Sequence, residues 1–189
     1  MKVEGWEQRY RTEAGVPDGS LPPPTPLVQR FLGVAQPGTA LDLAAGTGRN
    51  AIWLARHGWD VTAVDGAPTA IETLNKYAAQ SGVCVRTVLA DLEKGEYVIE
   101  PGMWDAITIC YYLQRGLLEP AKAGVRRGGL IVVIVHTTEG NELPTETRTS
   151  QGELLSYFKD WDVLHQYEGK PNDPEHRRSV AEIVARRPG

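Results

Sequence analysis

Short apolar segments alternate along this chain with segments in which apolar residues recur at helical spacing. Strands are predicted at residues 39–44, 60–65, 83–89, 104–111 and 130–136. Helices are predicted at residues 26–32, 50–57, 68–81 and 117–125. Thr25 is the expected N-cap of the first helix, and Ser150 with Glu153 is expected to form a capping box for a further helix. The alternation indicates an α/β fold with a mostly parallel sheet.

The last part of the chain breaks this pattern. Residues 162–168 and 179–187 are both strand-like, but the stretch that joins them contains two prolines and no helical periodicity. A parallel return needs a long and usually helical crossover, so these two strands should form an antiparallel hairpin. The predicted fold is Rossmann-like, a doubly wound, mostly parallel sheet that ends in an antiparallel β-hairpin.

We predict one domain over residues 1–189, because no linker or internal repeat divides the chain. The segment VPDGSLPPPTP, residues 16–26, favours an extended backbone. Residues 1–26 are therefore expected to form a Pro-rich arm or lid, and residues 27–189 to form the Rossmann-like core.

Composition excludes several classes of protein. The 189 residues include 20 Lys and Arg against 24 Asp and Glu, a net charge of −4, and 41% are hydrophobic, which is incompatible with disorder throughout. No apolar run approaches the roughly 18 residues of a membrane span, and the charged start resembles no secretion signal. The chain has no basic cluster for nucleic acid and no metal-spaced ligand set. We expect a cytoplasmic domain that handles a small molecule, without a metal.

The chemistry centres on a glycine turn. Gly46 and Gly48 follow the first predicted strand where it turns into a helix, and ligands of α/β sheets bind at this edge. Glycine lets the backbone approach a ligand, and the helix start offers N–H groups to an anion. Asp65 ends the second strand, where its carboxylate can accept both hydroxyls of a ribose. The pattern therefore predicts a ligand with a ribose and an anionic group.

Two cofactors match this description. GTGRNA, residues 46–51, formally satisfies the dinucleotide pattern G-x-G-x-x-A. Asp42, however, lies just before the turn, where its charge would repel a pyrophosphate but suit an ammonium and a sulfonium. We therefore favour S-adenosylmethionine. An NAD(P)-dependent reductase is the alternative, and a non-catalytic S-adenosylmethionine-binding sensor is a third reading.

The same stretch resembles a known family. DLAAGTGRNAIWLA, residues 42–55, is similar to motif I of class I S-adenosylmethionine-dependent methyltransferases, and DVTAVDGAP, residues 60–68, resembles their ribose motif. ADLE, residues 90–93, resembles the adenine motif. The GTGRN turn, residues 152–169 and the final AEIVARRP are most similar to small methyltransferases of the tellurite-resistance type. The third motif-I glycine of the family is Ala44 here.

This resemblance implies roles for individual residues. Asp42 would anchor the amino end of the methionine, while the backbone at Ala44, Gly46 and Gly48 would wrap its tail. Asp65 would hold the ribose. The adenine would be contacted by Gly66, Ala67, Asp91 and Leu92. The sulfonium would lie above Cys110 and Tyr111. Trp6 and Tyr10 would fold back over the cofactor as a lid.

Methyl transfer from a sulfonium is an in-line displacement from an activated donor, so a general base is needed only if the acceptor must lose a proton. Candidate catalytic residues therefore come from position alone: Tyr111, His136 and Arg177. The connection of the final hairpin contains His176, Arg177 and Arg178, and similar methyltransferases place a His-Arg pair there, near the acceptor. Neighbouring arginines suit an anionic acceptor. The expected acceptor is a small molecule, either anionic or a soft nucleophile.

Overall fold

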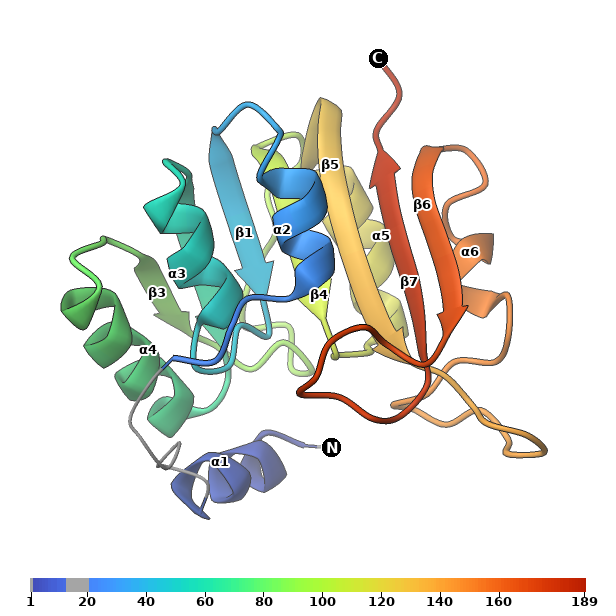
Figure 1. Ribbon diagram of the computed structural model, residues 1–189, viewed down its shortest axis with the longest axis horizontal. Coiled ribbons are helices and arrows are strands. Elements are labelled where there is room, and N and C mark those ends of the chain that lie inside the picture. Colours follow the sequence, from blue (N-terminus) through green and yellow to red (C-terminus); the bar gives the residue numbers. More distant parts are fainter. Residues whose placement is uncertain (1, 13–20) are drawn as a thin grey trace. The chain divides into compact units, whose positions relative to one another are not determined.

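A computed structural model of the chain describes residues 2–12 and 21–189 (Figure 1). Its residues cluster into two compact units, Met1–Val98 and Ile99–Gly189. The prediction of a single domain stays a prediction. Residues 1 and 13–20 of the predicted arm, residues 1–26, lie outside the described residues, and residues 21–25 adopt no regular secondary structure before α2 begins.

The first unit is a parallel three-stranded arrangement with its helices. Its strands run in the order β3-β2-β1, and all neighbouring pairs are parallel. Helices α3 and α4 connect them and pack against each other, and α1 packs against α4 (Figure 1). The elements are α1 (Val3–Thr12), α2 (Pro26–Leu32), β1 (Thr39–Leu43), α3 (Arg49–Arg56), β2 (Asp60–Asp65), α4 (Pro68–Gln80) and β3 (Arg86–Leu89).

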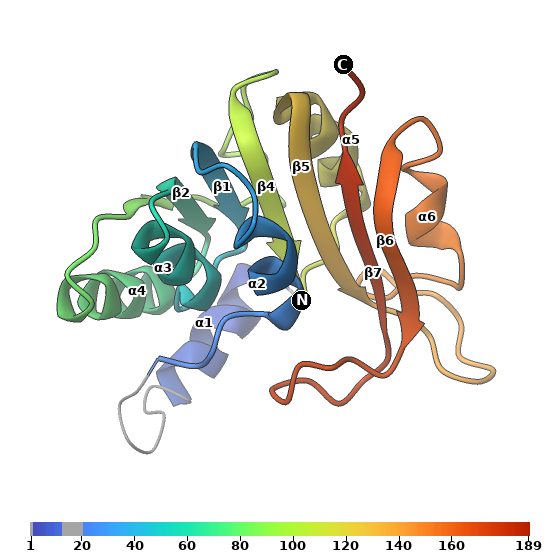
Figure 2. The ribbon, with the colours of Figure 1, turned by 45° about the horizontal axis from the view of Figure 1, so that its top comes forward.

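The second unit continues with strands in the order β4-β5-β7-β6. Strands β4 and β5 are parallel, whereas β7 is antiparallel to both β5 and β6. Figure 2 shows β7 lying between β5 and β6, with α6 beside them. The elements are β4 (Trp104–Cys110), α5 (Arg115–Gly124), β5 (Val125–His136), α6 (Glu153–Ser156), β6 (Asp162–Gly169) and β7 (Val180–Arg186).

Apolar strands explain these arrangements. Residues 130–135 of β5 are buried on both faces, as are residues 61–64 of β2. Burying one Leu, Ile or Val side chain stabilises the fold by roughly 1.5–3 kcal/mol, so such runs define the core. The predicted α/β architecture is confirmed, because the strands of the first unit are all parallel and the second unit ends in an antiparallel hairpin.

Several local predictions need correction. Helix α1 was not predicted, because only Val3, Trp6 and Tyr10 mark its apolar side and none of its residues is fully buried. Strand β5 begins at Val125 rather than at residue 130, since the register shift between Trp104 and Ala106 lets the pairing extend back. Strand β3 is shorter than predicted, because it pairs with β2 only from residue 86 onward.

At both predicted helix caps, the hydrogen bonds differ from those expected. Thr25 stands at the N-cap of α2, but its hydroxyl makes no cap, and its backbone N–H donates to Asn50 Oδ1 at 2.9 Å. Gly152, not Ser150, is the N-cap of α6. Glu153 Oε2 does accept from the Ser150 N–H at 2.9 Å, so one half of the capping box forms. The Ser150 hydroxyl donates to the same carboxylate oxygen at 3.1 Å.

Gly48 is the position where the turn after β1 most clearly requires glycine. Its φ is +87°, and a Cβ there would lie 2.4 Å from Leu74 Cγ. We predict that Gly48→Ala lowers the free energy of unfolding by about 3 kcal/mol, through backbone strain and a core clash together. Gly58→Ala is the matched control, because Gly58 also has a φ of +87° but only ordinary contacts, with Pro37. Gly58→Ala should lower the free energy of unfolding by about 1 kcal/mol, through backbone strain alone. Equal losses in urea unfolding would contradict the clash.

Candidate functional site

The buried carboxylate of Asp65 organises the predicted cofactor site in the first unit. Asp65 ends β2 with 6% of its surface exposed. Its Oδ2 accepts from the Gly46 N–H at 2.8 Å, and its Oδ1 accepts from the Ala67 N–H at 2.9 Å. Burial raises the pKa of Asp65, while these backbone hydrogen bonds act in the opposite direction. The carboxylate thus ties the glycine turn to the start of α4.

The turn after β1 has the backbone form that the sequence predicts for close approach to a ligand. Ala44, Gly46 and Gly48 all have positive φ values, +55°, +56° and +87°. Ala44 keeps this conformation although it is not glycine, a strained arrangement of the kind that clusters at ligand sites. No side chain caps the start of α3, which follows Gly48 directly. Asp42, on β1, is buried with 2% exposure.

The end of β3 lies beside the end of β2. A Cβ on Gly66 would be 3.4 Å from the Ala90 carbonyl oxygen, so the two strand ends are in contact. Leu92 and Ala67 are buried. Asp91 Oδ1 accepts from the Glu93 N–H at 3.0 Å, and its Oδ2 pairs with Lys94 Nζ at 2.9 Å. These contacts give Asp91 a structural role in its own turn, and its adenine contact stays a prediction.

Helix α1 lies over the same residues. The Tyr10 hydroxyl would be 2.7 Å from a Cβ on Gly46, and Val3 Cγ2 would be 2.7 Å from a Cβ on Gly66. Between them, Glu7 accepts from both the N–H and the hydroxyl of Thr69, at 3.0 and 2.7 Å. One side of α1 thus covers the glycine turn, the end of β2 and the start of α4.

Glu7 supplies the cap that α4 lacks. The N-cap residue Ala67 has no side-chain oxygen, and Pro68 has no N–H, so Thr69 carries an orphan donor. Although burial acts the other way, hydrogen bonds from Thr69 and Arg11 hold the pKa of Glu7 below its ordinary value. Glu7 was not among the predicted site residues. The Glu7–Arg11 spacing and the positions of Val3 and Tyr10 are the signal for this helix.

A second cluster forms at one end of the strands in the second unit. Tyr111 follows β4 and stacks on His176, with ring centroids 3.3 Å apart and an interplanar angle of 6°. His136, at the end of β5, lies 5.7 Å from each of these rings. Cys110 is half-buried next to Tyr111. The structure therefore brings together Tyr111 and His136, two of the predicted catalytic residues.

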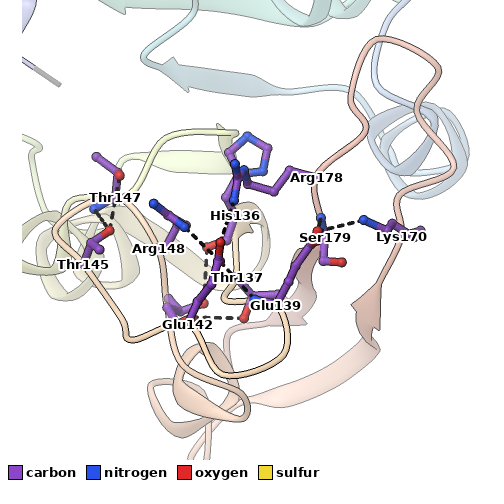
Figure 3. A network of polar contacts seen from close by, with 11 residues as sticks. His136, Thr137, Glu139, Glu142, Thr145, Thr147, Arg148, Lys170, Arg178 and Ser179 are labelled. Carbon is purple, nitrogen blue, oxygen red and sulfur yellow. Dashed lines mark hydrogen bonds and ion pairs between the residues drawn. The ribbon is translucent and has the colours of Figure 1, made fainter.

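Arg177 is not part of this cluster's described contacts. It is exposed, and its backbone carbonyl accepts from Lys170 Nζ at 3.2 Å. Figure 3 shows instead the side chain of Arg178 extending toward the His136 ring. Burial lowers the pKa of His136, and the charges of Arg178 and Arg148 lower it further, whereas the Ser179 backbone acts in the opposite direction. The arginines whose charges lower the pKa of His136 are therefore Arg178 and Arg148.

The connection between β5 and α6 is fixed to the connection between β6 and β7 (Figure 3). Glu139 Oε1 accepts from Lys170 Nζ at 2.8 Å and from the Ser179 N–H at 2.7 Å. These contacts lower the pKa of Glu139 to about 2, with the Lys170 bond as the largest cause. Glu142 pairs with Arg148 at 2.8 Å and with Arg178 at 3.5 Å.

The described residues also bear on two other classes of site. Within residues 2–12 and 21–189, no group of three or more His, Cys, Asp or Glu side chains is arranged to hold a metal ion. Over the same residues, no helix has the length and apolar character that crossing a membrane requires.

Comparison with known proteins identifies the relatives of this chain. It is 30% identical over 135 residues to hemagglutinin 1 of Eikenella corrodens, covering 68% of this chain and 45% of that protein. It is 28% identical over 142 residues to the probable S-adenosyl-L-methionine-dependent methyltransferase TehB of Haemophilus influenzae, covering 71% and 50%. The chain thus spans about half the length of the curated relatives it matches.

Solved structures show the same fold. The crystal structure of TehB from Haemophilus influenzae matches with a TM-score of 0.71 and 24% identity, covering 98% of this chain and 66% of that one. The 1,6-didemethyltoxoflavin-N1-methyltransferase of Burkholderia thailandensis, solved with S-adenosylhomocysteine, matches with a TM-score of 0.70 and 18% identity, covering 99% and 87%. These likenesses confirm the predicted class I methyltransferase fold.

His136 makes the second cluster sensitive to pH. The pKa of His136 is lower in the folded chain than in the unfolded chain, where it is about 6.5. As the pH falls through this range, the unfolded chain therefore binds a proton at His136 more readily than the folded chain does. The stability that His136 contributes is therefore complete above this pH and declines below it. We predict that His136→Gln destabilises the chain more at pH 7.5 than at pH 5.5 in urea unfolding. His57→Gln controls for loss of an imidazole, and a larger cost at pH 5.5 would contradict the prediction.

The family itself is identified by its sequence model. The model described as tellurite resistance protein TehB matches residues 27–173, which is most of the chain and includes the glycine turn, Asp65 and Tyr111. The predicted resemblance is confirmed: the chain belongs to the TehB family of class I S-adenosylmethionine-dependent methyltransferases.

Proposed function

We propose that this chain binds S-adenosylmethionine in its first unit and catalyses transfer of the methyl group to a small-molecule acceptor by in-line displacement. The observation that carries the proposal is the Asp65 carboxylate, buried at the end of β2 and bonded to both Gly46 and Ala67. Membership in the TehB family supports the same activity.

The residues of the first unit suit this cofactor. The turn at Gly46 and Gly48 is left-handed, and Gly48, the N-cap residue of α3, has no side chain that would compete with a carboxylate for the N–H groups of the helix start. Asp42 would balance the ammonium, and Asp65 would accept the ribose hydroxyls. Bound S-adenosylmethionine would supply an electrophilic methyl group, and the remaining requirements are alignment and exclusion of water.

Helix α1 would act as the cover of the bound cofactor. Tyr10 and Val3 lie against Gly46 and Gly66, and the Glu7 hydrogen bonds to Thr69 hold the helix there. Exchange of the cofactor for its demethylated product then requires α1 to leave this position. Trp6 stacks on Tyr10, with ring centroids 6.1 Å apart, and would stiffen the same side of the helix.

The acceptor would bind at the second cluster. Tyr111, His136 and His176 provide aromatic and imidazole groups, and Arg148 and Arg178 add positive charge close to His136. Because its pKa is lowered, His136 is neutral near pH 7 and can accept a proton from an acceptor. The arginines favour an anionic acceptor.

Calorimetric titration tests the cofactor. We predict micromolar binding of S-adenosylmethionine and at least a fivefold weaker affinity for Asp65→Ala, equivalent to about 1 kcal/mol. Asp60→Ala, at the exposed start of the same strand, is the matched control and should bind normally. Thermal melting of each variant without ligand separates a lost contact from a damaged fold. Stabilisation by NADPH but not by S-adenosylmethionine would favour the reductase instead.

A panel of acceptors tests the reaction. Transfer of a labelled methyl group is measured with a thiol, an oxyanion, an amine and a carboxylate, and with total RNA as the macromolecular alternative. Methylation of a small molecule supports the proposal. Labelling of RNA alone would overturn the small-molecule acceptor, and tight cofactor binding without any transfer would favour the sensor.

If α1 covers the bound cofactor, weakening its attachment should speed dissociation of the product. Glu7→Ala removes the cap on Thr69, so S-adenosylhomocysteine should dissociate about tenfold faster, measured by stopped-flow displacement. Glu4→Ala is the matched control, because Glu4 has the same charge on the same helix and is exposed. Identical dissociation rates in the two variants would argue against α1 as the cover.

A further inference from the structure

Tyr111 has an unusual backbone conformation at the end of β4. Its φ is +62°, a region that bulky side chains rarely occupy and that costs about 1–3 kcal/mol. Its N–H donates to the Ile134 carbonyl of the neighbouring strand β5 at 2.6 Å. Such a conformation persists only where surrounding contacts hold it.

Asp173 is the partner of the Tyr111 hydroxyl. It lies in the connection between β6 and β7 with only 3% of its surface exposed, and its Oδ2 accepts from Tyr111 Oη at 2.9 Å. Its Oδ1 accepts from the Glu175 N–H at 3.1 Å, and its backbone carbonyl accepts from the His176 N–H at 3.1 Å. A buried carboxylate is tolerated only when hydrogen-bonded, and here both oxygens are used.

The same contacts orient His176. Its ring lies on the face of the Tyr111 ring with the two planes nearly parallel, while the hydrogen bond from its N–H to the Asp173 carbonyl fixes its backbone. The connection around it contains Pro171 and Pro174 and forms neither helix nor strand. One carboxylate therefore joins this irregular segment to the end of β4, and the phenol ring determines the plane of the imidazole.

This arrangement is unfavourable for Tyr111 as a base. Its hydroxyl already donates to a carboxylate, and a phenolate in the same place would face that carboxylate as a like charge 2.9 Å away. We propose that Asp173 is a positioning residue, which holds Tyr111 as a rigid platform for the His176 ring on the acceptor side of the reaction. The proposal rests on the methyltransferase function proposed above.

Two tyrosine variants separate a platform from a base. Tyr111→Phe keeps the ring and removes the hydroxyl, whereas Tyr111→Leu removes the ring. Tyr111→Phe keeps the stacking ring but breaks the bond to Asp173, so a platform predicts that it loses methyl transfer only as far as Asp173→Ala does, about tenfold with the fastest acceptor from the panel. Tyr111→Leu, which also removes the ring, should lose at least a hundredfold. Tyr112→Phe is the matched control, because the Tyr112 hydroxyl donates to Gln114 Oε1 at 2.8 Å, outside this cluster. Loss of activity in Tyr111→Phe equal to that in Tyr111→Leu would overturn the platform.

We call the hydrogen bond that the Tyr111 hydroxyl donates to Asp173 the clamp. Asp173→Ala tests it, and Asp173→Asn is the conservative rescue because the amide oxygen can still accept from Tyr111. Asp173→Ala should lose at least tenfold in kcat or kcat/KM for the acceptor, and Asp173→Asn should recover part of it. Affinity for S-adenosylmethionine within twofold of the parent shows that each variant is folded. In the Tyr111→Phe background the effect of Asp173→Ala should shrink, since the bond through which it acts is absent. Full additivity would contradict the clamp.

Nuclear magnetic resonance of the His176 ring protons tests the clamp without any acceptor. Stacking on Tyr111 should shift these signals upfield, and Tyr111→Leu should return them fully downfield. Tyr111→Phe and Asp173→Ala break the same hydrogen bond, so both should return the signals partway and to a similar extent. Unchanged signals in Asp173→Ala would overturn the proposal. If the parent chain methylates nothing in the panel, the proposed function fails, and the clamp stands or falls on these signals alone.

Discussion

The carboxylate of Asp65 is the contact on which the first unit's site depends. It is removed from water at the end of β2, and such a charge is tolerated only if hydrogen bonds replace its hydration. The N–H groups of Gly46 and Ala67 do this from two different loops, so the glycine turn and the start of α4 are held together by one side chain. These two hydrogen bonds form without a ligand, and they determine the backbone conformation that a ligand would contact.

Glu7 extends the same principle to α1. Both acids satisfy N–H groups around the start of α4, Asp65 at Ala67 and Glu7 at Thr69, and each raises the energetic cost of the other's charge. The hydrogen bonds to Thr69 offset that cost for Glu7 only while α1 is in place. The position of α1 is therefore coupled electrostatically to Asp65, although α1 buries none of its residues fully.

The parts of the chain that could be predicted from sequence are those in which backbone periodicity determines position. The strands 60–65 and 130–136, the glycine turn and the final hairpin follow from apolar runs, glycine and proline. Residues whose role depends on a long-range side-chain contact left no such pattern. Asp173 is one acid in a polar, proline-containing stretch, and nothing in its neighbours indicates that it is buried or that it meets Tyr111, 62 positions earlier. Arg177 and Arg178 are adjacent, and only the fold distinguishes which one approaches His136.

The two halves of the chemistry therefore differ in how they are built. In the first unit, main-chain groups at the ends of regular elements form the site, and substitutions there act chiefly through backbone conformation, as at Gly48. In the second unit, side chains from irregular connections form it, held by Asp173, Glu139 and Glu142. Apart from Asp65, the first site depends on few side chains, whereas the second site depends on several side-chain contacts within its connections. The cofactor site should accordingly constrain the fold, while the connections around His136 and His176 are where a change of acceptor requires the fewest substitutions.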